Sequence, residues 1–371
     1  MEMEMIRMQT TIPNSNINPE NLIQSIFDIV NGYRKCKVLY AAAELNISKF
    51  IPPNGKIHVS QLANQMNVNQ DKLYRLMRSL TNVGVFKEVD GESPDTNVDM
   101  VESSGVFSHS QLSMIIKDDS IRDVIRMLGG SSQMNAWNSI VDTVKTGKLD
   151  LQSSIGYQSY WDLLENEPTE REIFDRSMTT FTKKMGGPIL SHCDFSHFDT
   201  IVDCGGGEGW LIEEILKKNN IIKNGINFDL DAVIKTKKTN TCQDSRFKDV
   251  AGSFFESVPE ADLYIFKNVL HNWNESSIVE ILQTVSKSIK PNGKIYILDI
   301  LPERNLKNEK TSLAVWHDMH MMMICDGKER DGCDYEKICI QTDFKVEKVN
   351  TISKTFGFSI GQIILSKVSN L

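Results

Sequence analysis

The sequence predicts an α/β fold: a Rossmann-like sheet in the C-terminal half, preceded by a mostly helical domain with the pattern of a winged helix. Two observations carry this prediction. Residues 200–230 contain a buried strand, a glycine-rich turn, an amphipathic helical segment and a second buried strand, which is the β-α-β unit of parallel nucleotide-binding sheets. Before position 190, apolar residues recur mostly at helical spacing.

The chain length favours two domains. The chain has 371 residues, which is long for a single domain. We expect a flexible polar arm at 1–17, a helical domain at 18–190 and a sheet domain at 191–371. The boundary follows Gly186-Gly187-Pro188, which is expected to end the last helix before the sheet.

The first helix is predicted to begin at Asn18-Pro19-Glu20, where an N-cap asparagine precedes a proline at the first helical position. An apolar stripe follows, made of Leu22, Ile26, Val30 and Tyr33. The run at 38–45 is apolar enough to form a second, more deeply buried helix.

Residues 60–90 have the pattern of a winged helix. Ser60 is expected to cap one helix, a second helix covers 71–80, and a small β wing begins at 83. A winged helix raises the question of DNA binding. Three basic residues on its second helix favour that function: Lys72, Arg75 and Arg78. A formal net charge of −8 argues against it, because nucleic-acid affinity depends on basic surfaces, so no nucleic-acid partner is expected.

The sheet domain continues with strands at α/β spacing. Further strands are expected at 249–252, 263–266 and 294–299, with a helix at 277–289. The tail offers two more strands, within 344–349 and 359–366, that can close the sheet in antiparallel fashion. Ligands of such sheets bind beyond the carboxyl ends of the strands.

The composition is that of an ordinary globular protein, with 40% hydrophobic and 24% charged residues. No run approaches the ~18 apolar residues of a membrane span, and the N-terminus lacks the apolar core of a secretory signal. We therefore expect a cytoplasmic protein with no membrane partner. The seven cysteines show no C-x-x-C spacing and no matching histidine cluster, which predicts free thiols and no zinc site.

The glycine-rich turn distinguishes between ligands. Dinucleotide-binding folds use G-x-G-x-x-G, whereas this chain has Asp203-x-Gly205-x-Gly207-x-Gly209. A carboxylate before the glycines is unsuited to a phosphate, but it suits the cationic amino-acid group of S-adenosylmethionine. Asp229, at the tip of the next strand, is placed to accept both ribose hydroxyls. The turn therefore predicts an S-adenosylmethionine site and disfavours a dehydrogenase.

A candidate base follows the fourth strand. His271 lies at a strand-to-helix turn on the ligand side of the sheet, where Asp299 and Glu329 are expected to converge. A histidine supported by carboxylates is a competent general base. A phenol, with a pKa of about 10, needs such a base to attack a methyl donor at neutral pH. No cluster of oxygen ligands for a metal is found, so the predicted reaction is metal-independent.

Several apolar side chains are candidates for binding a flat aromatic acceptor. Four methionines occur at 319–323 and can form a pliable apolar wall beside the base. Two residues of the upstream helical segments are further candidates. The predicted acceptor contacts are Trp137, Met178, Met319 and Met323. The spacing of His317 and His320 is too weak a signal to predict a metal site.

Over nearly the whole chain, these motifs resemble the S-adenosylmethionine-dependent O-methyltransferases of the caffeic-acid and hydroxyindole type. The V-D-x-G-G-G-x-G motif of that family matches residues 202–209, and its F-D-L ribose segment matches 228–230. Its L-H-D-W base motif matches 270–273, with asparagine in place of the aspartate, and its G-K-E-R segment matches 327–330.

The resemblance implies a class I methyltransferase sheet, an N-terminal dimerisation domain and a homodimer. It also implies that His271 is the catalytic base and that Asp299 and Glu329 are its flanking acids. Ser253 stands where the family has an acid that contacts adenine. The implied cofactor contacts are Asp203, Gly205, Gly207, Asp229, Leu230, Ser253, Phe254 and Lys267.

We therefore expect an S-adenosylmethionine-dependent O-methyltransferase of secondary metabolism that methylates a hydroxyl of a small aromatic compound. Two alternatives stay open: an N-methyltransferase of an aromatic amine, and a non-catalytic S-adenosylmethionine-binding regulator. The presence of both His271 and Glu329 argues against the regulator.

Overall fold

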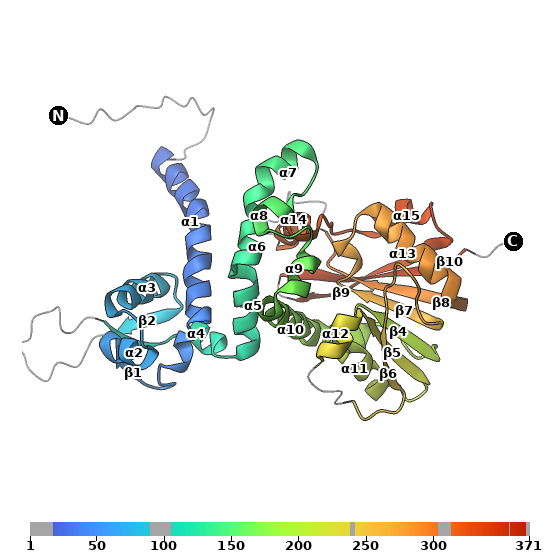
Figure 1. Ribbon diagram of the computed structural model, residues 1–371, viewed down its shortest axis with the longest axis horizontal. Helices are drawn as coiled ribbons and strands as arrows, with labels where there is room; N and C mark the ends of the chain where they lie inside the picture. Colours follow the sequence, from blue (N-terminus) through green and yellow to red (C-terminus); the bar gives the residue numbers. More distant parts are fainter. Residues whose placement is uncertain (1–17, 90–104, 238–241, 303–312, 356, 369–371) are drawn as a thin grey trace, which may run out of the picture. The chain divides into compact units, whose positions relative to one another are not determined.

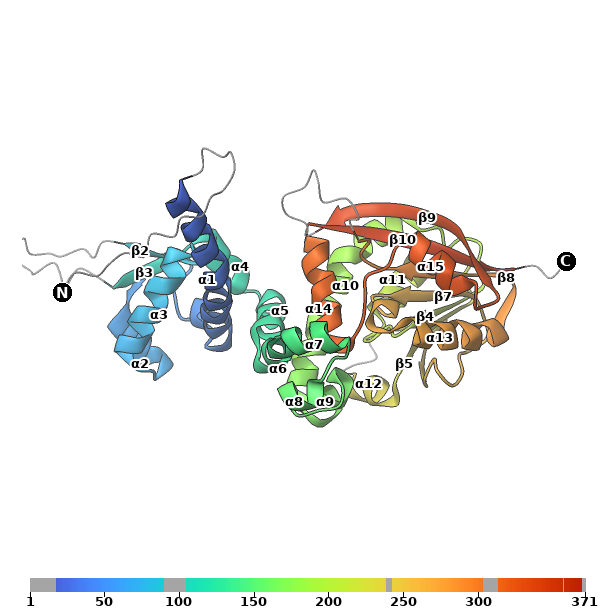
Figure 2. The ribbon, with the colours of Figure 1, turned by 90° about the horizontal axis from the view of Figure 1, so that it is seen from above.

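The computed structural model describes residues 18–89, 105–237, 242–302, 313–355 and 357–368. The arm predicted at 1–17 lies outside the described residues. The chain forms two compact units, Met1–Lys117 and Asp118–Leu371, whose elements are labelled in Figures 1 and 2. The helices after 118 thus belong to the same compact unit as the sheet. The division at 190 into a helical and a catalytic domain stays a prediction.

The first unit contains the predicted winged-helix elements. Its three short strands form a sheet of order β1-β3-β2 with antiparallel pairings. Buried Leu62, Met77 and Phe107 form part of its core. The elements of this unit are α1 (Pro19–Glu44), η1 (Ile47–Lys49), β1 (Lys56–His58), α2 (Val59–Met66), α3 (Gln70–Asn82), β2 (Phe86–Val89), β3 (Val106–His109) and α4 (Gln111–Ile116).

The N-terminal helix begins as predicted but does not end as predicted. The side chain of Asn18 accepts a hydrogen bond from the backbone N–H of Glu20 at 3.1 Å. The prediction of two helices is wrong, because α1 is continuous over 26 residues; the residues between the two expected segments include Arg34 and Lys35, which favour helix. The predicted cap of α2 is also wrong: Nδ1 of His58 accepts the N–H of Ser60.

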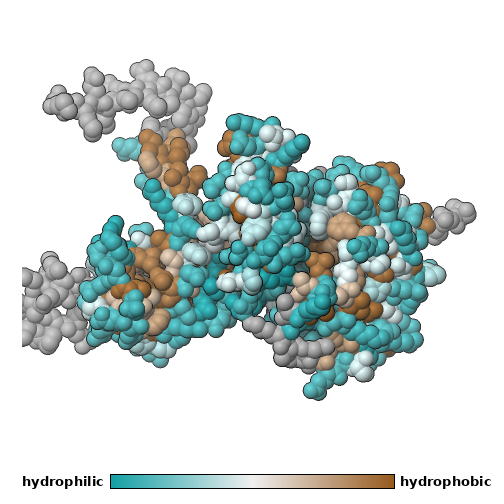
Figure 3. All heavy atoms as spheres, in the orientation of Figure 1, coloured by the Kyte–Doolittle hydropathy of each residue, from teal (hydrophilic) through white to brown (hydrophobic). Residues whose placement is uncertain are grey.

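The part of α1 from Ile23 to Tyr33 carries a contiguous apolar surface. Six large apolar side chains on it are more than half exposed: Ile23, Ile26, Phe27, Ile29, Val30 and Tyr33. They form part of the brown patch along this helix in Figure 3. Single exposed apolar residues are normal, but a continuous patch of this kind marks a contact surface.

The second unit begins with the predicted run of helices: α5 (Asp119–Gly129), α6 (Ser131–Ala136), η2 (Trp137–Ser139), α7 (Ile140–Thr146), α8 (Leu151–Ile155), α9 (Tyr160–Asn166) and α10 (Pro168–His192). The predicted break at 186–188 is wrong, because α10 continues through Pro188. Met185 and Ile189 are buried on either side of that proline, and tertiary burial outweighs the local helix-breaking tendency.

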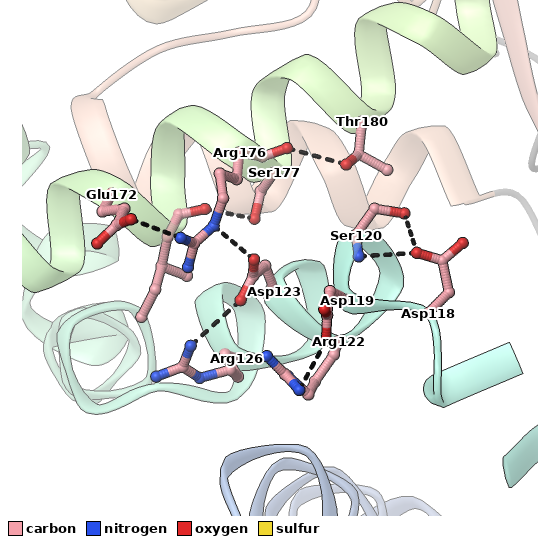
Figure 4. A network of polar contacts seen from close by, with 11 residues as sticks. Asp118, Asp119, Ser120, Arg122, Asp123, Arg126, Glu172, Arg176, Ser177 and Thr180 are labelled. Atoms are coloured by element: carbon pink, nitrogen blue, oxygen red, sulfur yellow. Dashed lines mark hydrogen bonds and ion pairs between the residues drawn. The ribbon is translucent and has the colours of Figure 1, made fainter. Parts of the chain in front are cut away.

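A network of ion pairs joins α5 to α10 (Figure 4). The carboxylate of Asp123, whose side chain is only 3% exposed, pairs with Arg126 at 3.2 Å and with Nε of Arg176 at 2.6 Å. Arg176 also pairs with Glu172 on its own helix at 2.6 Å. Because each oxygen of Asp123 has a cationic partner, its burial is compensated, and α10 is held against α5.

The sheet has seven strands in the order β6-β5-β4-β7-β8-β10-β9. The first four pairings are parallel, and β10 is antiparallel to both β8 and β9, as predicted for the C-terminal strands. The strands are β4 (Thr200–Cys204), β5 (Asn224–Asp229), β6 (Phe247–Ala251), β7 (Ala261–Lys267), β8 (Ile289–Leu298), β9 (Phe344–Thr355) and β10 (Phe358–Lys367).

Helices cover both faces of the sheet. One core contains residues of α13 (Glu275–Ser288) and α15 (Gly332–Cys339) with alternate residues of the central strands, such as Val202 and Tyr264. The other contains residues of α10 and α11 (Trp210–Lys218) with the intervening strand residues, such as Ile201 and Ile265. Successive strand side chains thus point into opposite layers, which is the predicted Rossmann-like arrangement. No helix in the described ranges is long and apolar enough to cross a membrane.

Candidate active site

The predicted site residues from the sheet lie at the carboxyl ends of four adjacent strands. Asp203 and Asp229 lie at the ends of β4 and β5, which pair with each other. Lys267 ends β7, and Asp299 directly follows β8. Because parallel strands present these ends at one edge, residues 96 positions apart in sequence meet at one place.

The glycine-rich turn between β4 and α11 has a backbone that only glycine adopts readily. Gly205 and Gly207 have φ angles of +70° and +59°. A Cβ at Gly207 would meet no atom within 4 Å, so open space borders the turn there. The N–H of Gly207 donates to Oδ2 of Asp229 at 2.8 Å, and the N–H of Leu230 donates to Oδ1 at 2.7 Å. These bonds fix the orientation of the carboxylate predicted to bind ribose.

Beneath the turn lies a polar group that sequence reasoning missed. Nδ2 of Asn227, which is fully buried, donates to the carbonyl of Gly207 at 3.0 Å and to Asp249 at 2.8 Å. Lys237 pairs with the same oxygen of Asp249 at 2.6 Å. The second strand thus supports the turn from below. The only sequence signal for this role is the position of Asn227, a polar residue between the apolar residues of β5.

Asp203 and Lys267 are buried opposite charges at this edge. Burial raises the pKa of Asp203 to about 7, against the opposing charge of Lys267. Burial likewise lowers the pKa of Lys267, against the charges of Asp203 and Asp299. Oδ2 of Asp203 has no hydrogen-bond partner in the described part of the chain. A cationic ligand group at this oxygen would satisfy it.

The predicted adenine segment follows β6. Oγ of Ser253 accepts the N–H of Phe255 at 3.3 Å. The ring of Phe254 packs against Phe255 and, edge-on, against Trp273, with centroids 5.2 and 6.2 Å away. These aromatic side chains lie next to the segment that contains His271, because Trp273 directly follows η3 (Leu270–Asn272). The other predicted cofactor contact, Leu230, is 44% exposed at the end of β5.

His271 lies in η3 and is paired with Glu329, as predicted. Its Nδ1 is 2.8 Å from Oε1 of Glu329, and the two side chains are 6% and 0% exposed. Burial alone would lower the pKa of His271, but the charge and hydrogen bond of Glu329 outweigh burial and raise it. The pKa of Glu329, which burial alone would raise, is lowered by His271 and His317. Glu329 is therefore ionised.

The segment that carries Glu329 folds back onto η3 and onto α14 (Leu313–Cys325). The N–H of Lys328 donates to the carbonyl of His271 at 2.9 Å. A Cβ at Gly327 would lie 2.1 Å from that same carbonyl oxygen, so only glycine permits this approach. The N–H of Glu329 donates to Oδ1 of Asp318 at 2.8 Å. The acid is thus positioned by backbone contacts to two elements.

Glu329 also contacts a histidine that sequence reasoning set aside. Nδ1 of His317, on α14, is 2.7 Å from the same Oε1 that His271 contacts. The two imidazole rings are 5.7 Å apart, with 33° between their planes. No spacing in the sequence identifies His317, because the contact depends on the fold of the loop before Glu329.

Asp299, predicted as the other flanking acid, is buried next to the base but is held differently. Its Oδ1 accepts the backbone N–H of Asn268 at 2.8 Å, and no hydrogen bond to His271 is found among the described residues. Burial raises the pKa of Asp299 to about 6, although His271 lowers it. Its effect on the base is therefore through charge.

The candidate acceptor residues come from three elements. Trp137, in η2, stacks on His320 of α14 with centroids 6.3 Å apart, and burial lowers the pKa of His320 to about 3. Met319 is half-buried and Met323 fully buried on α14, and Met178 is half-buried on α10. His320 lies about one helical turn after His317 on α14, so Trp137 stacks on a close neighbour of His317. Contact of these four residues with an acceptor stays a prediction.

One cluster of possible metal ligands occurs in the described residues: His271, His317 and Glu329, with ligand atoms within 4.8 Å of one another. Both imidazole nitrogens lie at hydrogen-bond distance from one carboxylate oxygen. Because an ionised carboxylate only accepts, each Nδ1 carries a proton. These nitrogens therefore have no free lone pair for a metal in this arrangement.

Comparison with known proteins identifies both halves of the chain. The model of the O-methyltransferase dimerisation domain matches residues 27–115, and that of the O-methyltransferase domain matches residues 137–345. Des-methyl DIF-1 methyltransferase A of Dictyostelium discoideum is 30% identical, over 96% of this chain and 100% of its own length.

A further relative and a solved structure of the same fold extend this comparison. The phenazine O-methyltransferase PhzM of Lysobacter antibioticus is 26% identical over 91% of this chain and 95% of its own. The crystal structure of human N-acetylserotonin methyltransferase in complex with SAM has the same fold, with a TM-score of 0.79 at 20% identity, covering 96% of this chain and 100% of that chain. The predicted resemblance is confirmed: the chain belongs to the S-adenosylmethionine-dependent O-methyltransferase family.

Proposed function

We propose that this enzyme transfers the methyl group of S-adenosylmethionine to a phenolic hydroxyl of a small aromatic metabolite, with His271 as general base and without a metal. The single observation that carries this proposal is the buried pair of His271 and ionised Glu329 at the edge of the sheet that carries the glycine-rich turn. A relative is a phenazine O-methyltransferase, which supports an aromatic acceptor.

The residues at the strand ends fit the cofactor. The orphan Oδ2 of buried Asp203 suits the cationic amino-acid group, and the open space at Gly207 gives the ligand access to the turn. Asp229, already oriented by two backbone N–H groups, retains lone pairs for the ribose hydroxyls. When bound, S-adenosylmethionine supplies the electrophilic methyl group. The protein supplies proximity, orientation and the base.

His271 is set up to take the proton of the acceptor. Its Nδ1–H is engaged by Glu329, so its Nε2 carries the lone pair. Nε2 would take the hydroxyl proton of the acceptor as its oxygen displaces S-adenosylhomocysteine from the methyl group, and Glu329 would stabilise the resulting imidazolium. Because the pKa of His271 is raised and the base works unprotonated, turnover should increase with pH past the ordinary histidine value of about 6.5.

The exposed apolar face of α1 supports a homodimer. Four of its six side chains, those from Phe27 to Tyr33, lie within residues 27–115, which match the dimerisation domain. Burying these six side chains against a second copy would remove them from water, which is the dominant favourable contribution to most protein association.

The experiment that tests the function is a methyl-transfer screen with labelled S-adenosylmethionine, a panel of phenols, hydroxyindoles and aromatic amines, and EDTA in parallel. We expect label on a phenolic compound at the same rate with and without EDTA. Loss of transfer with EDTA would contradict metal independence, and label on amines alone would replace the hydroxyl acceptor with a nitrogen. Calorimetry with S-adenosylhomocysteine, run beside the screen, tests the cofactor site by itself.

Cofactor binding should also release a proton below neutral pH. Asp203 has a pKa of about 7 in the free protein and is thus largely protonated at about pH 6. A cationic group beside it favours the carboxylate, so binding should release close to one proton at about pH 6 and much less at about pH 8. Calorimetry in buffers of different ionisation enthalpy measures this release. The same release from Asp203→Asn would show that another group titrates.

A further inference from the structure

We propose that His317 is a positioning residue for the catalytic base. By sharing Oε1 of Glu329 with His271, it holds the carboxylate in place and weakens the stabilisation that this carboxylate gives to a protonated His271. The inference rests on the proposed role of His271 as base. It concerns a residue outside the motifs by which the site was predicted, and it stands on the geometry of three side chains.

The shared oxygen determines the tautomers of both rings. Oε1 of Glu329 is 2.8 Å from Nδ1 of His271 and 2.7 Å from Nδ1 of His317. An ionised carboxylate accepts both bonds, so both rings carry their proton on Nδ1 when neutral. His271 thereby keeps Nε2 free as the basic nitrogen.

The orientation of the carboxylate depends on Oε1. The other oxygen, Oε2, has no hydrogen-bond partner among the described residues. The backbone N–H of Glu329 is held by Asp318, the residue after His317. Two consecutive residues of α14 thus hold Glu329, one through its side chain and one through its backbone. Without His317, the buried side chain would keep a single hydrogen bond.

His317 is itself held by packing. Its ring meets Phe358 edge-on, with centroids 5.5 Å apart, and lies 6.2 Å from the ring of His320. Its side chain is 24% exposed, against 6% for His271. The ring is therefore fixed in place at the more solvent-exposed side of Glu329.

The hydrogen bond from His317 has a predictable electrostatic sign. An N–H donated to Oε1 stabilises the negative charge of Glu329, so the carboxylate stabilises an imidazolium at His271 less strongly. Removing this donor should make His271 harder to deprotonate and raise its pKa, by roughly one pH unit for a bond to a charged group.

Other charged or titratable groups also face this cluster. Asp299 raises and Lys267 lowers the pKa of His271, and His320 lies beside His317 on α14. Asp318 accepts the backbone N–H of Glu329. The charge of Glu329 also acts on Cys325 and Tyr335, and the charge of Arg330 acts on Tyr335. All of these stay in place when only position 317 is changed, so a comparison of variants at 317 isolates the donor.

The first test needs no acceptor. Nitrogen NMR of the full-length protein, with ¹⁵N-labelled histidine, reports the tautomer and the pKa of each ring, and His271→Gln assigns the signal of the base. In the wild type we expect the Nδ1–H tautomer for both rings. The proposal is overturned, without any variant at 317, if neutral His317 carries its proton on Nε2 or if only one of the two neutral rings carries its proton on Nδ1.

Two variants then separate the donor from the ring. His317→Phe keeps an aromatic ring against Phe358 and removes the N–H, whereas His317→Asn removes the ring and places an amide N–H near the position of Nδ1. We expect the pKa of His271 to rise by roughly one unit in the Phe variant and to stay near the wild-type value in the Asn variant. Equal shifts in both variants, or none in either, contradict the proposal.

Kinetics give a second readout once an acceptor is found. In His317→Phe, the acid limb of the plot of kcat/KM against pH should move to higher pH. Its kcat should fall, while the KM for S-adenosylmethionine stays at the wild-type value. In His317→Asn, the acid limb should lie near its wild-type position. Calorimetry with S-adenosylhomocysteine checks each variant for an intact cofactor site. Absence of methyl transfer by the wild type would refute the proposed function, whereas an unmoved pKa would refute only the role of His317.

Discussion

Replacing His271 with alanine should lower turnover by roughly 10²–10⁴-fold, the usual contribution of a general base, while leaving S-adenosylhomocysteine affinity nearly unchanged. The side chain is buried and its Nδ1 is paired with Glu329, so alanine removes the basic Nε2 together with the ring that Glu329 orients. Steady-state kinetics with the acceptor from the screen, together with calorimetry, measure both quantities. The remaining activity of the variant should lack the acid limb assigned to this imidazole.

A matched control is His197→Ala. His197 is 80% exposed and forms an ion pair with Asp194, which is 60% exposed, so its removal should change turnover little. Turnover of His271→Ala within about threefold of the wild type would contradict its role as base. A parallel loss of S-adenosylhomocysteine binding would mean instead that the substitution damages the cofactor site.

The parts of the fold that were predictable from sequence are those specified by local patterns. β4 and α11 occur within residues 200–230 in the predicted order, because a short apolar run followed by a glycine-rich turn leaves little freedom in where the strand ends. The positions of Asp203, Asp229 and His271 follow from the carboxyl ends of β4, β5 and β7. Their common location needed only the rule that parallel strands carry ligands at their carboxyl ends.

The errors, and the contacts that no sequence pattern revealed, arise where long-range packing decides. α10 continues through Pro188 because burial of its flanking residues outweighs a local signal. Asp299 accepts a bond from the backbone of Asn268, which has a φ of +54°, and no sequence pattern reports such a turn. His317 meets Glu329 only because residues 326–329 fold back on α14. Residue types alone could nominate the acids but not their partners.

Replacing Asp229 with alanine should weaken cofactor binding by roughly 10²–10³-fold, through two losses. Hydrogen bonds to a charged group contribute about 1.5–3 kcal/mol each, and the predicted pair to the ribose hydroxyls would disappear. The N–H groups of Gly207 and Leu230 would also lose their acceptor, which frees the turn that must contact the ligand. Calorimetry with S-adenosylmethionine and S-adenosylhomocysteine measures the effect.

Asp231→Ala is the control for a lost carboxylate in the same segment. Asp231 begins α12 (Asp231–Thr236), its side chain is 61% exposed, and it pairs with Lys235, so its removal should leave cofactor affinity within about twofold, as expected for an exposed ion pair. Asp229→Asn keeps one acceptor oxygen for the turn or the ribose and should bind with intermediate affinity. An affinity of Asp229→Ala equal to that of Asp231→Ala would remove Asp229 from the ribose site, because both losses follow from the same carboxylate.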